Sequence, residues 1–225
     1  MLLSDLLKQS LDTATLECWQ RERTATPIRA FAVRLHSAGL SLRETEAVLR
    51  LLGVELSFQA IFQWVHRLSD SLSNPPKAKP RRVAVDETAI KINGEWPWMY
   101  AAIDLDTKLV LDATLFKRHG TNPAAAFLFG LAEKHDLSDA VFLVDQFSYR
   151  TALARLGLNS RVDYTDRNLI EKWFQTLRMR VDWFHNSWVG SRLSVRRWIS
   201  MFVHYYNVHR PHQALGGRTP AQEVS

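Results

Sequence analysis

Apolar residues recur at every third or fourth position in three successive segments between Pro27 and Leu72. Glycines end the first two segments, and Ser41 with Glu44 gives the second segment the spacing of a capping box. The third segment begins at Ser57, directly after a short turn. Because this spacing places apolar side chains on one face of a helix, the pattern predicts three helices in a small all-α unit.

The third helix of this unit is predicted to have one apolar face and one polar face. Its apolar positions are Phe58, Ile61, Phe62, Val65 and Leu68. Its polar positions are Gln59, Gln63, His66 and Arg67. In a helix-turn-helix, the last helix enters the DNA major groove, where Gln pairs with adenine and Arg with guanine. Gln59, Gln63 and Arg67 are therefore candidates for base recognition, although an ordinary helical bundle has the same pattern.

The pattern changes twice after the helical unit. Residues 73–82 combine proline, lysine and arginine without apolar periodicity, which is typical of a linker. Alternating apolar residues then predict three strands, the first two joined by the turn pair Asn93-Gly94. A helix, a buried strand that ends at Asp145, a helix, a short strand and further helices follow. This order predicts a mixed α/β fold behind the small helical domain.

A late helix is predicted to carry apolar residues on one face and basic residues on the other. The apolar positions, which we interpret as core, are Val195, Trp198, Ile199, Phe202 and Tyr206. The basic positions are Arg192, Arg196 and Arg197. These arginines are candidates for contacts with DNA phosphates, although a solvated basic face explains them as well.

The composition fits a globular protein that acts on nucleic acid. Hydrophobic residues make up 46% of the 225 residues, and 29 Lys plus Arg against 23 Asp plus Glu give a net charge of +6. A basic surface attracts polyphosphate through counterion release. Cys18 is the only cysteine, which excludes an internal disulfide. The sequence has neither a signal-peptide pattern nor a membrane-spanning run, so we expect a cytoplasmic protein.

Three carboxylates lie at the ends of predicted elements. Asp86 and Asp145 each follow an apolar strand, and Glu171 lies in the first turn of an amphipathic helix. Mg²⁺ prefers oxygen ligands, and two such ions can activate an attacking oxygen and stabilise a leaving one in phosphodiester displacement. The three acids therefore predict strand chemistry on nucleic acid. Taken singly, a strand-end acid also aids solubility, and a Glu at a helix start also favours the helix dipole.

The helix that contains Glu171 also offers two further polar positions. Its core stripe consists of Ile170, Trp173, Phe174 and Leu177. Glu171, Gln175 and Arg178 follow a neighbouring stripe, so one helix can hold a metal ion and contact the same DNA. The competing acids, which we interpret as turn or solvent acids, are Glu87, Asp104, Asp106, Asp163 and Asp166. Strand alternation predicts that Glu87 points to the face opposite Asp86.

These segments together resemble the DDE transposases of the retroviral-integrase-like superfamily, most of all the insertion-sequence six family. The resemblance rests on VAVDET, the LVD segment, NLIEKWFQTLRMR and YYNVHRPHQALGGRTPAQEV. It covers residues 81–225, and the N-terminal helical unit also matches the family's arrangement. The resemblance implies an RNase H-like core in which Asp86, Asp145 and Glu171 ligate two Mg²⁺ (or Mn²⁺) ions.

The resemblance also implies a division of the chain and a function. Residues 1–72 are expected to form the helix-turn-helix DNA-binding region, residues 73–82 a basic linker, and residues 83–225 the catalytic domain with a C-terminal helix and tail. The implied activity is binding of terminal inverted repeats in double-stranded DNA, followed by metal-dependent strand cleavage and strand transfer. We expect a homo-oligomer, at least a dimer on DNA, associated with the nucleoid. The alternatives are a non-catalytic repressor derived from a transposase and an RNase H-like nuclease.

Overall fold

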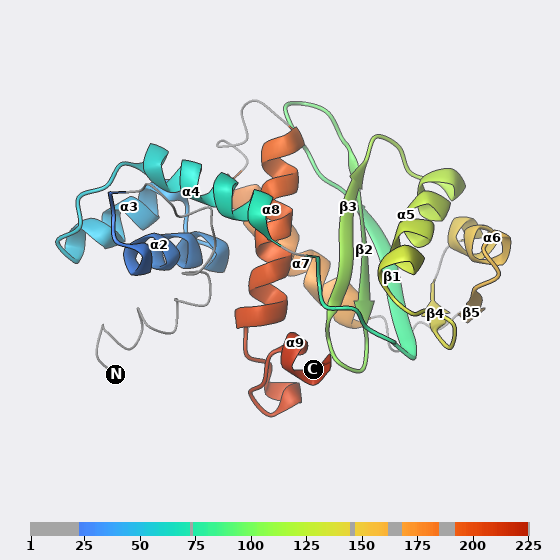
Figure 1. Cartoon of the computed structure of the whole chain (residues 1–225). Coiled ribbons are helices and arrows are strands. Elements are labelled where there is room, and N and C mark those ends of the chain that lie inside the picture. The colour runs from blue at the N-terminus through green and yellow to red at the C-terminus, as the bar shows by residue number, and fades with distance from the viewer. Residues whose placement is uncertain (1–22, 73, 145–146, 162–167, 185–191, 225) are drawn as a thin grey trace. The chain divides into compact units, whose positions relative to one another are not determined.

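The structure is a computed structural model that describes residues 23–72, 74–144, 147–161, 168–184 and 192–224 (Figure 1). The chain forms two compact units. The first unit contains the residues before Asn74 together with Leu193–Tyr205, and the second contains Asn74–Arg192 and Tyr206–Ser225. The late basic helix is therefore grouped mostly with the first unit, whereas the family resemblance implied that it belongs to the catalytic domain.

The first unit begins with the three helices that the apolar periodicity predicts. They are α2 (Thr26–Ala38), α3 (Leu42–Leu51) and α4 (Phe58–Ser71). The capping box is confirmed, because the Ser41 hydroxyl accepts a hydrogen bond from the Glu44 N–H at 3.1 Å and the Glu44 carboxylate accepts one from the Ser41 N–H at 2.7 Å. Helix α8 (Arg192–His204) contributes Met201 to the apolar core of these helices.

The buried face of α4 differs from the predicted one at its aromatic residues, because Trp64 is buried, Phe58 is half-buried and Phe62 is exposed. Ile61, Trp64, Val65 and Leu68 are buried, whereas Phe62 is 41% exposed. Positions three, four and seven residues after Ile61 form one helical stripe, and Phe62 lies about 100° away from Ile61 around the helix. The prediction that Phe62 belongs to the core was wrong for this reason.

A five-stranded mixed sheet forms the centre of the second unit, with the strand order β3-β2-β1-β4-β5. The strands are β1 (Arg82–Ala89), β2 (Trp98–Asp104), β3 (Val110–Phe116), β4 (Val141–Leu143) and β5 (Asn159–Arg161). The first three strands are antiparallel, whereas β4 runs parallel to β1 and β5 runs parallel to β4. This order confirms the mixed α/β prediction and is that of an RNase H-like core.

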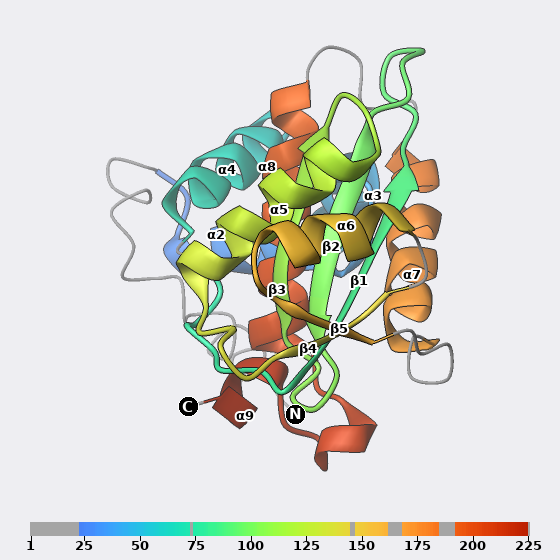
Figure 2. The same ribbon diagram turned by 90° about the vertical axis from the view of Figure 1, so that its right-hand side faces the viewer.

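Helices cover both faces of this sheet. Helices α5 (Thr121–Lys134) and α6 (Phe147–Arg155) lie on one face, and α7 (Asn168–Phe184) lies on the other (Figures 1 and 2). The core under α5 and α6 includes Val85 from the sheet and Leu128 from α5. None of the described helices is long and apolar enough to cross a membrane.

The segment after α8 is fastened to the edge strand β3. A π-helical turn, Tyr205–His209, carries Asn207, whose side chain is buried. The Asn207 amide accepts a hydrogen bond from the Val110 N–H and donates one to the Val110 carbonyl, both at 2.9 Å. The side chain thus supplies the donor and acceptor that a neighbouring strand would offer at this edge. A 3₁₀ turn (Gln213–Leu215) and α9 (Pro220–Val224) follow.

Candidate active site

Asp86 and Glu87 lie side by side on β1 but point to opposite faces of the sheet. The strand continues to Ala89, so the side chains alternate through both positions. Glu87 therefore shares the face of Val85, which packs in the core beneath α5 and α6, and the prediction that it points away from Asp86 is confirmed. Asp86 is half-buried, and its Oδ1 accepts a hydrogen bond from the Glu87 N–H at 2.9 Å. The Asp86 carboxylate is thus held by the backbone of its neighbour.

Glu171 lies in the first turn of α7, a helix that contacts β1. The predicted core stripe is confirmed, because Ile170, Trp173, Phe174 and Leu177 are all buried. Glu171 and Gln175 are exposed on the neighbouring stripe, and the side chain of Arg178 lies outside the described part of the structure. Because α7 covers the face away from α5 and α6, Glu171 and Asp86 belong to the same side of the sheet (Figure 2).

The second predicted carboxylate, Asp145, lies outside the described residues. The parallel pairing of β1 with β4 ends at Ala84 beside Leu143. Asp86 follows Ala84 by two positions, and Asp145 follows Leu143 by the same number. The pairing is therefore consistent with the assignment of Asp145, which stays a prediction.

The described donors suit a hard divalent metal ion. Asp86 and Glu171 offer carboxylate oxygens, the ligand type that Mg²⁺ and Mn²⁺ prefer. Within the described ranges, no group of three or more His, Cys, Asp or Glu side chains is placed to hold a metal ion. Two oxygen donors on contacting elements fit such an ion, and a further ligand has to come from another position of the chain.

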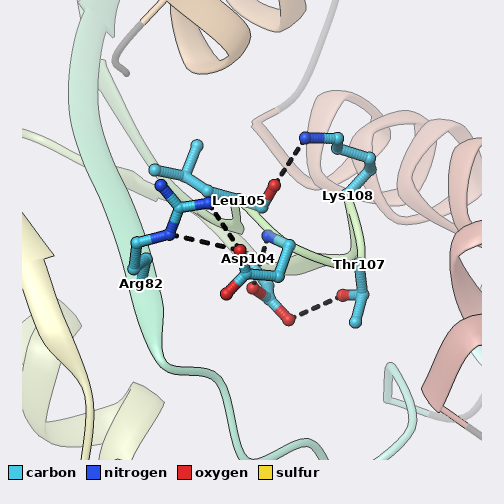
Figure 3. Close-up of polar contacts among 6 residues, drawn as sticks. Arg82, Asp104, Leu105, Thr107 and Lys108 are labelled. Carbon is cyan, nitrogen blue, oxygen red and sulfur yellow. Dashed lines mark hydrogen bonds and ion pairs between the residues drawn. The ribbon is translucent and has the colours of Figure 1, made fainter. Parts of the chain in front are cut away.

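Asp104 and Asp106, two acids that compete with the predicted metal ligands, form hydrogen bonds and an ion pair at the turn between β2 and β3 (Figure 3). Asp104 Oδ1 accepts a hydrogen bond from the Asp106 N–H at 2.9 Å, and its Oδ2 accepts one from the Thr107 hydroxyl at 2.6 Å. Asp106 in turn pairs with Arg82 at 2.6 Å. The interpretation of both as turn acids is confirmed. Asp163 and Asp166 lie outside the described residues.

The structure adds Tyr149, on α6, to the surroundings of Asp86. Burial raises the pKa of the Tyr149 hydroxyl well above its usual value, and the negative charges of Glu87 and Asp86 raise this pKa further. Tyr149 is therefore neutral at neutral pH, and its buried hydroxyl has no hydrogen-bond partner among the described residues. Strand alternation predicted that Glu87 points inward, but nothing in the sequence identified the residue of α6 that meets it.

Two of the three arginines predicted to contact phosphate are paired with acids of their own unit. Arg197 donates to both carboxylate oxygens of Asp70, at 2.7 and 2.5 Å. Arg192 donates to Glu95 at 2.5 Å. Arg196 is exposed. Exposed ion pairs of this kind contribute about 0–1 kcal/mol, so the two pairs oppose phosphate binding only weakly.

The outward face of α4 carries the three residues predicted to read bases. Gln59, Gln63 and Arg67 are all exposed. His66 differs from them, because it is half-buried and its Nδ1 lies 2.9 Å from the Arg197 Nη1. Burial, and then the positive charge of Arg197, lower the pKa of His66. His66 is thereby kept neutral as an acceptor for Arg197 within the first unit.

Comparison with known proteins identifies relatives of most of the chain. A family model described as a DDE domain matches residues 81–210. A transposase for insertion sequence-like element IS431mec from Staphylococcus aureus is 25% identical over 197 residues, which cover 83% of this chain and 87% of that protein. An uncharacterized protein of Methanocaldococcus jannaschii is 24% identical over 192 residues, which cover 84% of this chain and 89% of that protein. The catalytic core domain of BIV integrase matches with a TM-score of 0.48 and 14% identity, covering 64% of this chain and 93% of that one.

Proposed function

Because this chain belongs to the DDE-domain family of insertion-sequence transposases, we propose that it binds the terminal inverted repeats of an insertion sequence and transfers their strands to target DNA. The protein is an enzyme of DNA transposition that cleaves and joins strands. One observation carries the assignment of its site: Asp86 on β1 and Glu171 on α7 belong to contacting elements on the same side of the sheet.

We infer that Asp86, Asp145 and Glu171 hold two Mg²⁺ or Mn²⁺ ions. The bound ions supply activation of the attacking oxygen and stabilisation of the leaving one. The Glu87 N–H fixes one oxygen of Asp86 and so orients this carboxylate. A water molecule first hydrolyses the DNA strand at the end of the insertion sequence. The 3′-hydroxyl released by this cut then attacks a phosphodiester of the target DNA. No covalent bond between protein and DNA is needed in either step.

We propose that three groups of residues on the protein bind double-stranded DNA. The residues proposed to contact it are Gln59, Gln63, Arg67, Gln175, Arg178, Arg192, Arg196 and Arg197. The first three would read the terminal repeat, the next two would hold DNA beside the metal ions, and the last three would bind phosphate. The two ends of the insertion sequence have to be held at the same time, so we propose a homo-oligomer that is at least a dimer on DNA. Its substrate would place it at the nucleoid.

The function can be tested by incubating the purified full chain with Mg²⁺, a target plasmid and a duplex that ends in the inverted repeat flanking its reading frame. We expect the 3′ end of the duplex to become joined to the plasmid, and we expect joining to stop without a divalent ion while end binding continues. Binding without strand breakage would identify a repressor instead. Breakage without joining would identify a nuclease.

The arginines of α8 are expected to differ in their contribution to phosphate binding. Arg196→Gln should flatten the slope of log affinity against log salt by about 0.9, the value for one lost phosphate contact on B-DNA. Arg197→Gln and Arg192→Gln should flatten it less, because both of these side chains are half-buried whereas Arg196 is exposed. The measurement is the salt dependence of binding to random duplex DNA. An equal loss of slope in all three variants would mean that both ion pairs open on DNA.

A further inference from the structure

One half-buried arginine of α8 contacts two residues of α4. The side chain of Arg197 is 24% exposed, and its Nε and Nη2 donate to the two carboxylate oxygens of Asp70, at 2.7 and 2.5 Å. Its Nη1 lies 2.9 Å from His66 Nδ1. Because a guanidinium has donors and no acceptor, Nδ1 of His66 accepts this hydrogen bond. All three nitrogens of the guanidinium therefore bind side chains of α4.

Two further contacts join the same pair of helices. The Ser69 hydroxyl of α4 donates to the Arg197 carbonyl at 3.0 Å. Met201, four residues after Arg197 on α8, packs in the apolar core that α4 shares with α2 and α3. A bidentate pair between guanidinium and carboxylate adds a fixed geometry to its attraction. Together the polar and apolar contacts determine how α4 is oriented against α8.

The residues that Arg197 binds lie on the same face of α4 as the glutamines predicted to read bases. Successive residues of a helix are about 100° apart, so His66 and Asp70 lie within about 20° of Gln59 around the helix axis. Gln59 and Gln63 belong to the first half of α4, whereas His66 and Asp70 belong to the second half. In a helix-turn-helix, the N-terminal residues of the recognition helix contact base edges. Arg197 thus holds the second half of this face and leaves Gln59 and Gln63 exposed.

The same contacts make Arg197 better suited to orienting α4 than to binding phosphate. Arg197 commits three of its five N–H donors to α4. The carboxylate of Asp70 repels a phosphate that approaches the remaining donors. Side chains that recognise a ligand have to be held within about 0.5 Å of their productive positions by supporting residues that are themselves fixed. A fixed arginine on a neighbouring helix meets this requirement.

We propose that the main role of Arg197 is to position α4 for reading the terminal repeat, through its contacts with Asp70 and His66. The inference rests on the proposed function, because it takes α4 to be the helix that reads bases. It gives α8 a part in sequence recognition, which the basic pattern of this helix did not indicate. Arg197 is a positioning residue in this role, because it acts on DNA only through α4.

The experiment measures the affinity of the full chain for a duplex that ends in its inverted repeat and for random duplex DNA, and takes the ratio of the two. Asp70→Asn is the decisive variant, because it removes a negative charge. If Arg197 served phosphate alone, this change would strengthen binding to both DNAs and leave the ratio unchanged. We expect the ratio to fall about 5-fold instead, which corresponds to the upper end of the range for an exposed ion pair. Arg197→Gln should lower the ratio by a similar factor.

The matched control is Glu46→Gln, which breaks the 2.9 Å ion pair of α3 with Arg50 in the same unit. It should leave the ratio unchanged. The double variant Asp70→Arg with Arg197→Asp restores a pair of opposite charges, so it should regain most of the ratio that either single change loses.

Three results would overturn the positioning role. They are an unchanged ratio in Asp70→Asn, an equal fall in Glu46→Gln, and a double variant with a ratio as low as that of Arg197→Gln. If the double variant fails to fold, Asp70→Asn decides. The proposed function has a separate readout, because the parent must itself prefer its ends to random DNA. A parent without this preference would refute the proposed function, and the positioning role with it.

Discussion

Asp86→Asn, Asp145→Asn and Glu171→Gln are each expected to abolish strand cleavage and strand transfer while binding to the element's ends survives. The substitutions keep size and hydrogen-bonding capacity but remove the negative charge that a hard divalent ion requires. A lost metal ligand removes several kcal/mol of transition-state stabilisation, so we expect a rate loss of about 10³-fold or more. The measurement is single-turnover cleavage and joining of an end duplex, beside a binding assay with the same duplex.

The controls for this prediction are other acids of the second unit. Asp106→Asn removes a charge that the structure pairs with Arg82, and it should leave cleavage unchanged. Asp163→Asn and Asp166→Asn test the nearest rivals for the second position. If Asp145→Asn joins strands normally while either rival does not, the second carboxylate is misassigned. If every variant behaves as the parent does, the metal-dependent mechanism fails.

Features that depend on local sequence could be predicted. The spacing of Ser41 and Glu44 was enough for the capping box, because both hydrogen bonds join residues three positions apart. Alternation along β1 was enough to put Asp86 and Glu87 on opposite faces. The core stripe of α7 followed from helical spacing in the same way. In each case the side chains that interact belong to one element or to neighbouring ones.

Features that depend on long-range contacts could not be predicted. Arg197 and its partner Asp70 are 127 positions apart, and Asn207 lies 97 positions from Val110. The basic pattern of α8 could be seen in the sequence, but the ion pair between Arg197 and an acid of α4 could not. Tertiary packing, and not local propensity, decides such contacts.

The double substitution Gln63→Ala with Arg67→Ala is expected to remove the preference of the protein for its element's ends over random DNA. Both side chains are exposed on α4, which a buried stripe holds against α2 and α3, so they project from a fixed helix. A good contact between a side chain and a base edge discriminates by roughly 1–3 kcal/mol. Losing two contacts should therefore reduce the specificity ratio by at least about 30-fold if the effects add.

Footprinting on an end duplex, together with competition by random DNA, measures this ratio. Arg50→Ala is the matched control, because Arg50 is an exposed arginine of α3 that pairs with Glu46 at 2.9 Å and does not lie on the reading face of α4. It should change the affinity for both DNAs slightly and leave their ratio unchanged. An unchanged ratio in the double variant would remove α4 from recognition and leave the helical unit as a structural bundle. A fall in affinity for both DNAs by the same factor would instead assign these side chains to phosphate, because phosphate contacts carry no sequence information.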